Sequence, residues 1–217
     1  MQSIEICGDD LLSIEIDGRS KRAAVAQYLR ATGTWTECVE GMACVVVQFD
    51  NATTSVDEAK QRLASQLPNA SLQQLDTSTR IEIPVCYGGE FGPEFNSICE
   101  MMAITAEELI EIHTSREHRV VLVGFTPGFA YLAGVHDDLR IPRLTEPRQY
   151  VAAGSIGVAA GLTGVYATAG PGGWPLLGRT PMALRDADAE HPFTLRTGMR
   201  VRFRAIDAQT FAHMAAG

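Results

Sequence analysis

The segment Gly124-Phe125-Thr126-Pro127-Gly128-Phe129-Ala130-Tyr131-Leu132 joins a β-branched run to a turn rich in glycine, proline and aromatic residues. Glycine and proline stay concentrated up to residue 181, and their turns separate short strand-like runs. These runs cover residues 120–125, 150–153, 164–167, 176–178 and 201–204. Short strands joined by tight turns are typical of β-barrels and β-sandwiches. The second half of the chain is therefore predicted to be one of these.

The first part of the chain has a different texture, in which strand and helix patterns alternate. Strands are expected at 12–16, 43–49 and 80–85, and helices at 20–31 and 55–67. The second helix opens with the capping box Ser55-Val56-Asp57-Glu58. Two helices on one face of an antiparallel sheet form a small α+β domain of ferredoxin-like type, which we expect over residues 1–86.

A break in pattern follows at Tyr87-Gly88-Gly89-Glu90-Phe91-Gly92-Pro93, the expected domain boundary. Two leading helices are predicted beyond it, at 93–102 and 105–114, the latter opened by the capping box Thr105-Ala106-Glu107-Glu108. The second domain is expected over residues 87–217.

Composition excludes several classes of protein. The formal net charge of −8 argues against non-specific nucleic-acid binding. No apolar run reaches the roughly 18 residues of a membrane helix, and no signal peptide is visible, so a cytoplasmic location is expected. The five cysteines are odd in number and form no C-x-x-C pair, which favours reduced thiols over disulfides or a zinc site.

Charge is distributed unevenly along the chain. Residues 140–204 carry nine arginines against four acidic residues, a balance of +5, although the whole chain is acidic. A guanidinium matches a carboxylate or phosphate through two parallel hydrogen bonds. Some of these arginines are expected to bind a small anionic substrate, and others to lie on solvated strands.

Three loops supply candidate binding residues. The first offers Phe125, Pro127, Gly128 and Tyr131 as a rigid aromatic wall with close backbone approach. The second offers Arg143 and Arg148, each after a proline, and then Gly154 and Ser155. Ser155 lies in A-G-S-I-G, which differs from the G-x-S-x-G nucleophile elbow by one residue, so a ligand contact is favoured over a nucleophilic role. The third offers Gly172 and Gly173 as an anion nest, with Trp174 and Arg179 beside them.

His113 is the candidate acid/base residue. It shares a helix face with Ala106, Leu109 and Ile110, so a buried structural histidine is the competing interpretation. His118 lies five residues further on, which is not the spacing of a helical metal motif, and no metal site is expected.

The chain resembles the family of the bacterial 5-oxoprolinase B subunit, also known as allophanate hydrolase subunit 1 and as the Kip-type inhibitor of a sporulation histidine kinase. The resemblance rests on the motifs I-P-V-C-Y-G-G-E-F-G-P (83–93), I-H-T-S (112–115), G-F-T-P-G-F-A-Y-L (124–132), P-R at 142 and 147, A-G-S-I-G (153–157) and P-G-G-W…G-R-T-P (171–181). It implies a cyclophilin-like β-barrel for the second domain.

The resemblance also implies a function that the chain performs with partners. These are a homologue of the carboxyltransferase-like C subunit and an A subunit of the LamB/YcsF type, which together with this chain open 5-oxoproline to glutamate. ATP would be the co-substrate, with Mg²⁺ bound in the complex and no tightly bound cofactor. Two alternatives remain open: a binding module that inhibits a sensor histidine kinase, and the carboxyltransferase part of a biotin-dependent urea carboxylase.

Overall fold

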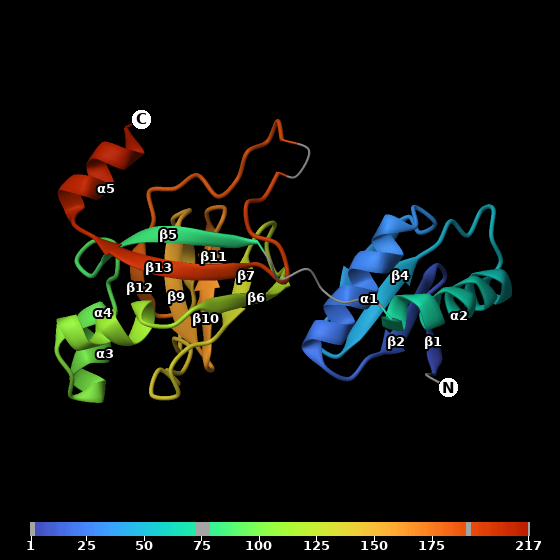
Figure 1. Cartoon of the computed structure of the whole chain (residues 1–217), viewed down its shortest axis with the longest axis horizontal. Coiled ribbons are helices and arrows are strands. Elements are labelled where there is room, and N and C mark those ends of the chain that lie inside the picture. The colour runs from blue at the N-terminus through green and yellow to red at the C-terminus, as the bar shows by residue number, and fades with distance from the viewer. Residues whose placement is uncertain (1–2, 73–78, 190–191, 217) are drawn as a thin grey trace. The chain divides into compact units, whose positions relative to one another are not determined.

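The computed structural model describes residues 3–72, 79–189 and 192–216. The chain divides into two compact units, Met1–Asp76 and Thr77–Gly217 (Figure 1). Each unit has its own hydrophobic core. No helix among the described residues is long and apolar enough to span a bilayer.

The N-terminal unit is a four-stranded antiparallel sheet with two helices. Its elements are β1 (Ile4–Cys7), β2 (Leu11–Glu15), α1 (Arg19–Ala31), β3 (Glu37–Glu40), β4 (Cys44–Gln48) and α2 (Val56–Leu72). The strand order is β1-β2-β4-β3, so β4 lies between β2 and β3, which are joined through α1. This is the split β-α-β arrangement of a ferredoxin-like fold.

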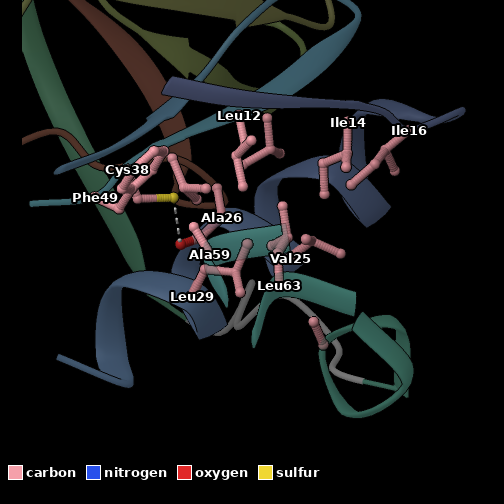
Figure 2. Close-up of a cluster of buried hydrophobic side chains, with 13 residues drawn as sticks. Leu12, Ile14, Ile16, Val25, Ala26, Leu29, Cys38, Phe49, Ala59 and Leu63 are labelled. Atoms are coloured by element: carbon pink, nitrogen blue, oxygen red, sulfur yellow. Dashed lines mark hydrogen bonds between the residues drawn. The ribbon is translucent and has the colours of Figure 1, made fainter. Parts of the chain in front are cut away.

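One face of this sheet carries the core. Alternate residues of β2 and β4 point to it, and Val25, Leu29 and Leu63 of the two helices pack against them (Figure 2). The expected Ser55–Glu58 capping box begins α2: Glu58 Oε2 accepts from the Ser55 backbone N–H at 2.9 Å. The helix runs past the expected residue 67 to Leu72 with Pro68 inside it.

The C-terminal unit is a closed seven-stranded barrel in the order β10-β7-β6-β13-β5-β12-β9, with a separate two-stranded ribbon of β8 and β11. The barrel strands are β5 (Arg80–Tyr87), β6 (His118–Val123), β7 (Ala130–Ala133), β9 (Ser155–Ala159), β10 (Leu162–Val165), β12 (Leu176–Arg179) and β13 (Arg200–Ile206). The ribbon strands are β8 (Arg148–Val151) and β11 (Gly170–Gly172), and the helices are α3 (Phe95–Met102), α4 (Ala106–Thr114) and α5 (Ala208–Ala215). The predicted α+β class with a barrel is confirmed.

The division between the two units falls before β5, not between residues 86 and 87 as expected, because β5 belongs to the barrel. β5 pairs in parallel with β13 from Arg80↔Arg200 to Cys86↔Ile206, and its far end pairs with β12. The sequence pattern predicted a strand here but carried no information about its pairing partners, which lie far later in the chain.

Candidate functional site

Four aromatic side chains gather beside the β8–β11 ribbon. Phe129 is the centre: its ring meets Tyr131, Tyr166 and Trp174 at centroid distances of 4.7, 4.8 and 5.7 Å, each edge-to-face. Tyr166 and Trp174 are 2% and 5% exposed. Edge-to-face packing fixes these rings, so the cluster is a rigid wall.

Arg143 lies over this wall. Its guanidinium carbon is 5.8 Å from the centre of the Trp174 ring, within range of a cation–π contact. Burial raises the pKa of Tyr131, and the nearby charge of Arg143 opposes that rise. The exposed loop that holds Arg143 is tied down by Leu144, whose backbone N–H donates to Gly173 O at 2.8 Å.

Arg148 lies next to the same wall and is held by Glu94. Its Nη2 donates to Glu94 Oε1, and Glu94 Oε2 accepts from the Leu176 backbone N–H at 2.8 Å. The other terminal nitrogen of Arg148, Nη1, is buried without a hydrogen-bond partner among the described residues.

The hydroxyl of Tyr166 is another buried group here without a partner among the described residues. It lies directly against Gly172, where an added Cβ would come within 2.3 Å of it. Gly172 is the strand partner of Arg148 across β11 and β8, and the charge of Arg148 lies near enough to Tyr166 to act on its pKa. Burial raises the pKa of Tyr166 and Tyr131 adds to the rise, while Arg148 and Arg143 oppose it. The Trp174 backbone also opposes the rise, although it does not form a hydrogen bond of normal geometry with the hydroxyl. A buried donor without an acceptor is a site where a ligand oxygen or a water is expected.

The 124–129 loop presents a different surface. Phe125 is 68% exposed at φ +83°, an uncommon conformation for a bulky residue, and its ring touches Phe129 at 5.8 Å. The carbonyl of Pro127 accepts from Thr168 Oγ1 at 3.3 Å. Gly128 is buried against Phe193, which leaves no room for a side chain. Phe125 is thus the aromatic residue of this loop that faces solvent.

Arg179 does not lie with Arg143 and Arg148 but lines a different part of the barrel unit. Its Nε donates to Ala153 O at 2.8 Å, and it lines a cavity of about 330 Å³ together with Gly154. Neither Arg143 nor Arg148 lines that cavity. The three guanidiniums expected to share one pocket are therefore divided between two places. The glycines also differ from expectation: Gly172 lies in a strand rather than an open nest.

Ser155 begins β9 and is 3% exposed. Its backbone carbonyl accepts from the Tyr166 N–H at 3.0 Å, and the Gly154 N–H donates to Tyr166 O at 2.7 Å. The 154–155 segment therefore fixes the backbone of Tyr166.

The position of His113 does not fit the expected catalytic role. It is completely buried, its Nδ1 shares a hydrogen bond with the Tyr87 hydroxyl at 2.7 Å, and its Nε2 shares one with Thr163 Oγ1 at 3.1 Å. The ring also stacks on Phe203 at 4.5 Å. Burial lowers the pKa of His113 well below its ordinary value, and His118 adds to the shift. The geometry is that of a neutral structural histidine.

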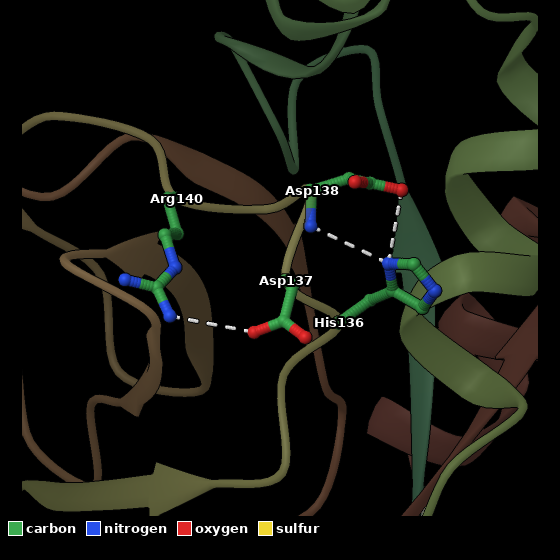
Figure 3. Close-up of polar contacts among 4 residues, drawn as sticks. All are labelled: His136, Asp137, Asp138 and Arg140. Carbon is green, nitrogen blue, oxygen red and sulfur yellow. Dashed lines mark hydrogen bonds and ion pairs between the residues drawn. The ribbon is translucent and has the colours of Figure 1, made fainter.

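Another polar group lies in the loop between β7 and β8. His136 pairs with Asp138 at 3.0 Å, and Arg140 with Asp137 at 3.4 Å (Figure 3). The Arg140 and Asp137 side chains are 74% and 84% exposed. Arg140 is therefore one of the arginines engaged locally at the surface. Among the described residues, no cluster of three or more His, Cys, Asp or Glu side chains has metal-binding geometry.

Sequence reasoning missed Glu94 and Tyr166. Glu94 lies in the G-P-E-F segment just beyond the G-G-E-F-G-P motif, and Tyr166 in a run expected to be an ordinary strand. Only the fold reveals that the first holds Arg148 and that the second has an unpaired hydroxyl.

Comparison with known proteins places the chain in a family. Residues 2–195 match the family described as "Carboxyltransferase domain, subdomain C and D". The chain is 37% identical over 180 residues to the B subunit of 5-oxoprolinase from Escherichia coli O157:H7, covering 82% of each protein. It is 44% identical over 131 residues to the Bacillus subtilis protein of the same name, covering 60% of this chain but 55% of that relative.

Solved structures agree on the fold. The structure of TTHA0988 matches with a TM-score of 0.78 and 29% identity, covering 92% of this chain and 40% of that one. Urea carboxylase of Kluyveromyces lactis matches with a TM-score of 0.72 and 17% identity, covering 98% of this chain and 22% of that one, a likeness of fold alone. The chain thus spans less than half of each of these two structures. By the family that residues 2–195 match and by its identity to these relatives, the chain belongs to the family of 5-oxoprolinase B subunits.

Proposed function

We propose that the chain is the B subunit of an ATP-dependent 5-oxoprolinase. The observation that carries this proposal is the 36–44% identity to three proteins that bear the name of this subunit. The reaction would open the lactam C–N bond of 5-oxoproline with water to give glutamate, while ATP is converted to ADP and phosphate. A homologue of the C subunit and an A subunit of the LamB/YcsF type would complete the enzyme in the cytoplasm.

The arginine–aromatic site suits one part of this reaction. 5-Oxoproline is a small flat ring that carries one carboxylate. Tyr131, the partly exposed member of the aromatic wall, would contact the ring, and Arg143 at the rim would attract the carboxylate. Arg148 Nη1 and the Tyr166 hydroxyl would donate to substrate oxygens, with Glu94 holding the guanidinium in place.

ATP enters this proposal as a co-substrate, with Mg²⁺ accompanying its phosphates in the complex. The charges of the phosphates and of the substrate carboxylate then need separate cationic partners. Having arginines in two places on one barrel is consistent with that need.

A second candidate is the carboxyltransferase part of a biotin-dependent urea carboxylase system. The description of the matching family, "Carboxyltransferase domain, subdomain C and D", favours it. Inhibition of a sensor histidine kinase stays a prediction from the resemblance.

The test reconstitutes the enzyme. The chain is co-purified with homologues of the A and C subunits, and ADP and glutamate formation are measured with and without 5-oxoproline. We expect lactam-dependent ADP release that stops when this chain is omitted. Arg143→Ala should raise the KM for 5-oxoproline about tenfold, while Arg140→Ala, which alters an exposed arginine, should not. No turnover by the full set of folded subunits would contradict the proposal, and biotin-dependent urea carboxylation would favour the second candidate.

A further inference from the structure

The cavity beside Arg179 is lined by residues 153–154 and 179–185, by Ala167 and by the last helix, α5. Gly154 and Arg179 form one side, the 180–185 segment continues it, and Phe211 of α5 contributes from the helix. Phe211 is 9% exposed and its ring packs on Phe91 at 4.3 Å, which fixes this side of the cavity. At about 330 Å³, the cavity lies at the lower end of the range for small-molecule sites.

Two arginines, Arg179 and Arg185, line this cavity, and neither has a carboxylate partner among the described residues. Arg179 uses only Nε, toward Ala153 O, so both terminal nitrogens of its fork remain available. Arg185 is exposed and has no side-chain hydrogen bond or ion pair there. Two like charges at one cavity repel each other unless an anion lies between them.

Two carboxylates near the lining segments in sequence have other roles. Asp186 Oδ1 accepts from the Asp188 backbone N–H at 3.1 Å, and Asp207 Oδ1 caps α5 by accepting from the Thr210 N–H at 2.7 Å. Within the part of the chain that the structure describes, no acidic residue lines the cavity. In contrast, the cavity of about 260 Å³ in the N-terminal unit is lined by Glu5, Glu15 and Asp17 with one lysine.

We infer that the cavity between Arg179 and Arg185 is a second oxyanion site, which binds the carboxylate or phosphate group of a small molecule. Two free guanidinium forks supply the charge and the parallel donors that such groups require. Met182, Leu184 and Phe211 give the cavity apolar walls for the uncharged part of the ligand. The inference rests on the proposed function only for the choice of probes, since the proposed reaction has one carboxylate substrate and one phosphate product.

The experiment titrates 5-oxoproline and inorganic phosphate separately into the purified full chain by calorimetry at low ionic strength. We expect one of them to bind in a way that Arg185→Ala weakens, and that probe identifies the oxyanion. Binding of 5-oxoproline that only Arg143→Ala weakens belongs to the arginine–aromatic site and counts against the cavity. Arg185→Ala should weaken binding about tenfold or more, because a charge-assisted hydrogen bond is lost. Arg202→Ala, which alters an exposed arginine of β13 that does not line the cavity, should change affinity less than about twofold.

Two outcomes would overturn the inference: neither probe binds, or the two arginine variants lose affinity equally. The reconstituted assay separates this failure from failure of the proposed function. If the complex turns over 5-oxoproline but the cavity binds neither probe, the proposed function is supported and the oxyanion site is refuted. If binding depends on Arg185 but the complex does not turn over 5-oxoproline, the oxyanion site is supported and the proposed function is refuted.

Discussion

Glu94 holds Arg148 by one carboxylate oxygen while its other oxygen accepts the Leu176 backbone N–H at 2.8 Å. The side chains of Arg148 and Glu94 are only 28% and 17% exposed. One side chain at the start of α3 thus connects the ribbon strand β8 to the barrel strand β12. The guanidinium is oriented before any ligand arrives, which lowers the entropy cost of binding.

Glu94→Gln should destabilise the chain by about 2 kcal/mol, since it leaves a half-buried guanidinium without its charged partner. Urea denaturation of the purified chain measures the change. Glu117→Gln is the matched control: Glu117 is 40% exposed and pairs with Arg80 and Arg200 at the surface, so a loss below about 1 kcal/mol is expected. Equal losses in the two variants would show that Glu94 has no special role.

Tyr166→Phe should leave the free energy of unfolding unchanged or raise it by up to about 1 kcal/mol, because the hydroxyl removed has no partner among the described residues. If that hydroxyl serves a substrate oxygen, the KM of the reconstituted enzyme for 5-oxoproline should rise severalfold. The two measurements on this variant therefore distinguish the roles. A structural hydroxyl would lower the free energy of unfolding when removed, whereas a substrate-binding hydroxyl would raise the KM without lowering the free energy of unfolding. An unchanged KM would remove Tyr166 from the site.

Gly172→Ala should cost about 2 kcal/mol of stability, because the new Cβ would lie 2.3 Å from the Tyr166 hydroxyl and 2.9 Å from its ring carbons. Tyr166→Phe removes the nearest of these atoms, so the double variant should be more stable than the sum of the two single changes predicts. Gly170→Ala in the same strand is the control, since nothing lies within 4 Å of its added Cβ. Strict additivity would refute the close contact.

Much of the fold was predictable because its signals are local. The capping boxes at Ser55 and Thr105 begin helices as expected, and strands form at β2, β4 and β5, where strand patterns predicted them. The alternation expected in β5 does not hold at its far end, where four consecutive residues are buried inside the barrel unit. The strands β1, β3, β7, β9 and β11 and the helix α5 were missed; β7, β9 and β11 overlap glycine-containing segments that were interpreted as loops. The partner of β5 was unpredictable in principle, since the Arg80↔Arg200 register is a long-range property.

The site was predictable in its residue types but not in its grouping. Glycine, proline and aromatic turns indicated Tyr131, Arg143, Arg148 and Trp174, which the fold brings to one aromatic wall. Arg179 has the same chemistry, but it ends a strand that directs it to another cavity. His113 was predicted as a catalytic candidate, but the fold buries it. A helix pattern alone cannot reveal that both of its ring nitrogens have hydrogen-bond partners.

Acid should destabilise the barrel through His113 and His118. Burial lowers both pKa values, so the folded chain keeps the two rings neutral while the unfolded chain protonates near pH 6.5. Their contribution is complete above about pH 6.5 and is lost as the pH falls toward the folded-state values, by up to about 1.4 kcal/mol per pH unit for each ring.

Urea denaturation at about pH 7.5 and about pH 5, on either side of the ordinary histidine pKa, measures this loss. The variant His113→Asn should show a shallower pH dependence than the native chain, whereas His213→Asn, at an exposed position in α5, should match the native slope. Parallel slopes in all three proteins would exclude the buried pair as the source.

The cysteines should differ sharply in reactivity, and the N-terminal core supplies the reason. Cys38 is 3% exposed, its Sγ lies 3.6 Å from Ala26 O, and burial raises the pKa of its thiol to about 11 (Figure 2). Only the thiolate attacks an alkylating reagent, so this thiol should react slowly even at about pH 8. Cys7 is exposed in β1 and should react first. Timed iodoacetamide labelling followed by peptide mass spectrometry should find Cys7 modified at least about tenfold faster than Cys38 in the native chain. In urea, Cys38 should react at the same rate as Cys7. Comparable rates in the native chain would show that the N-terminal core opens readily.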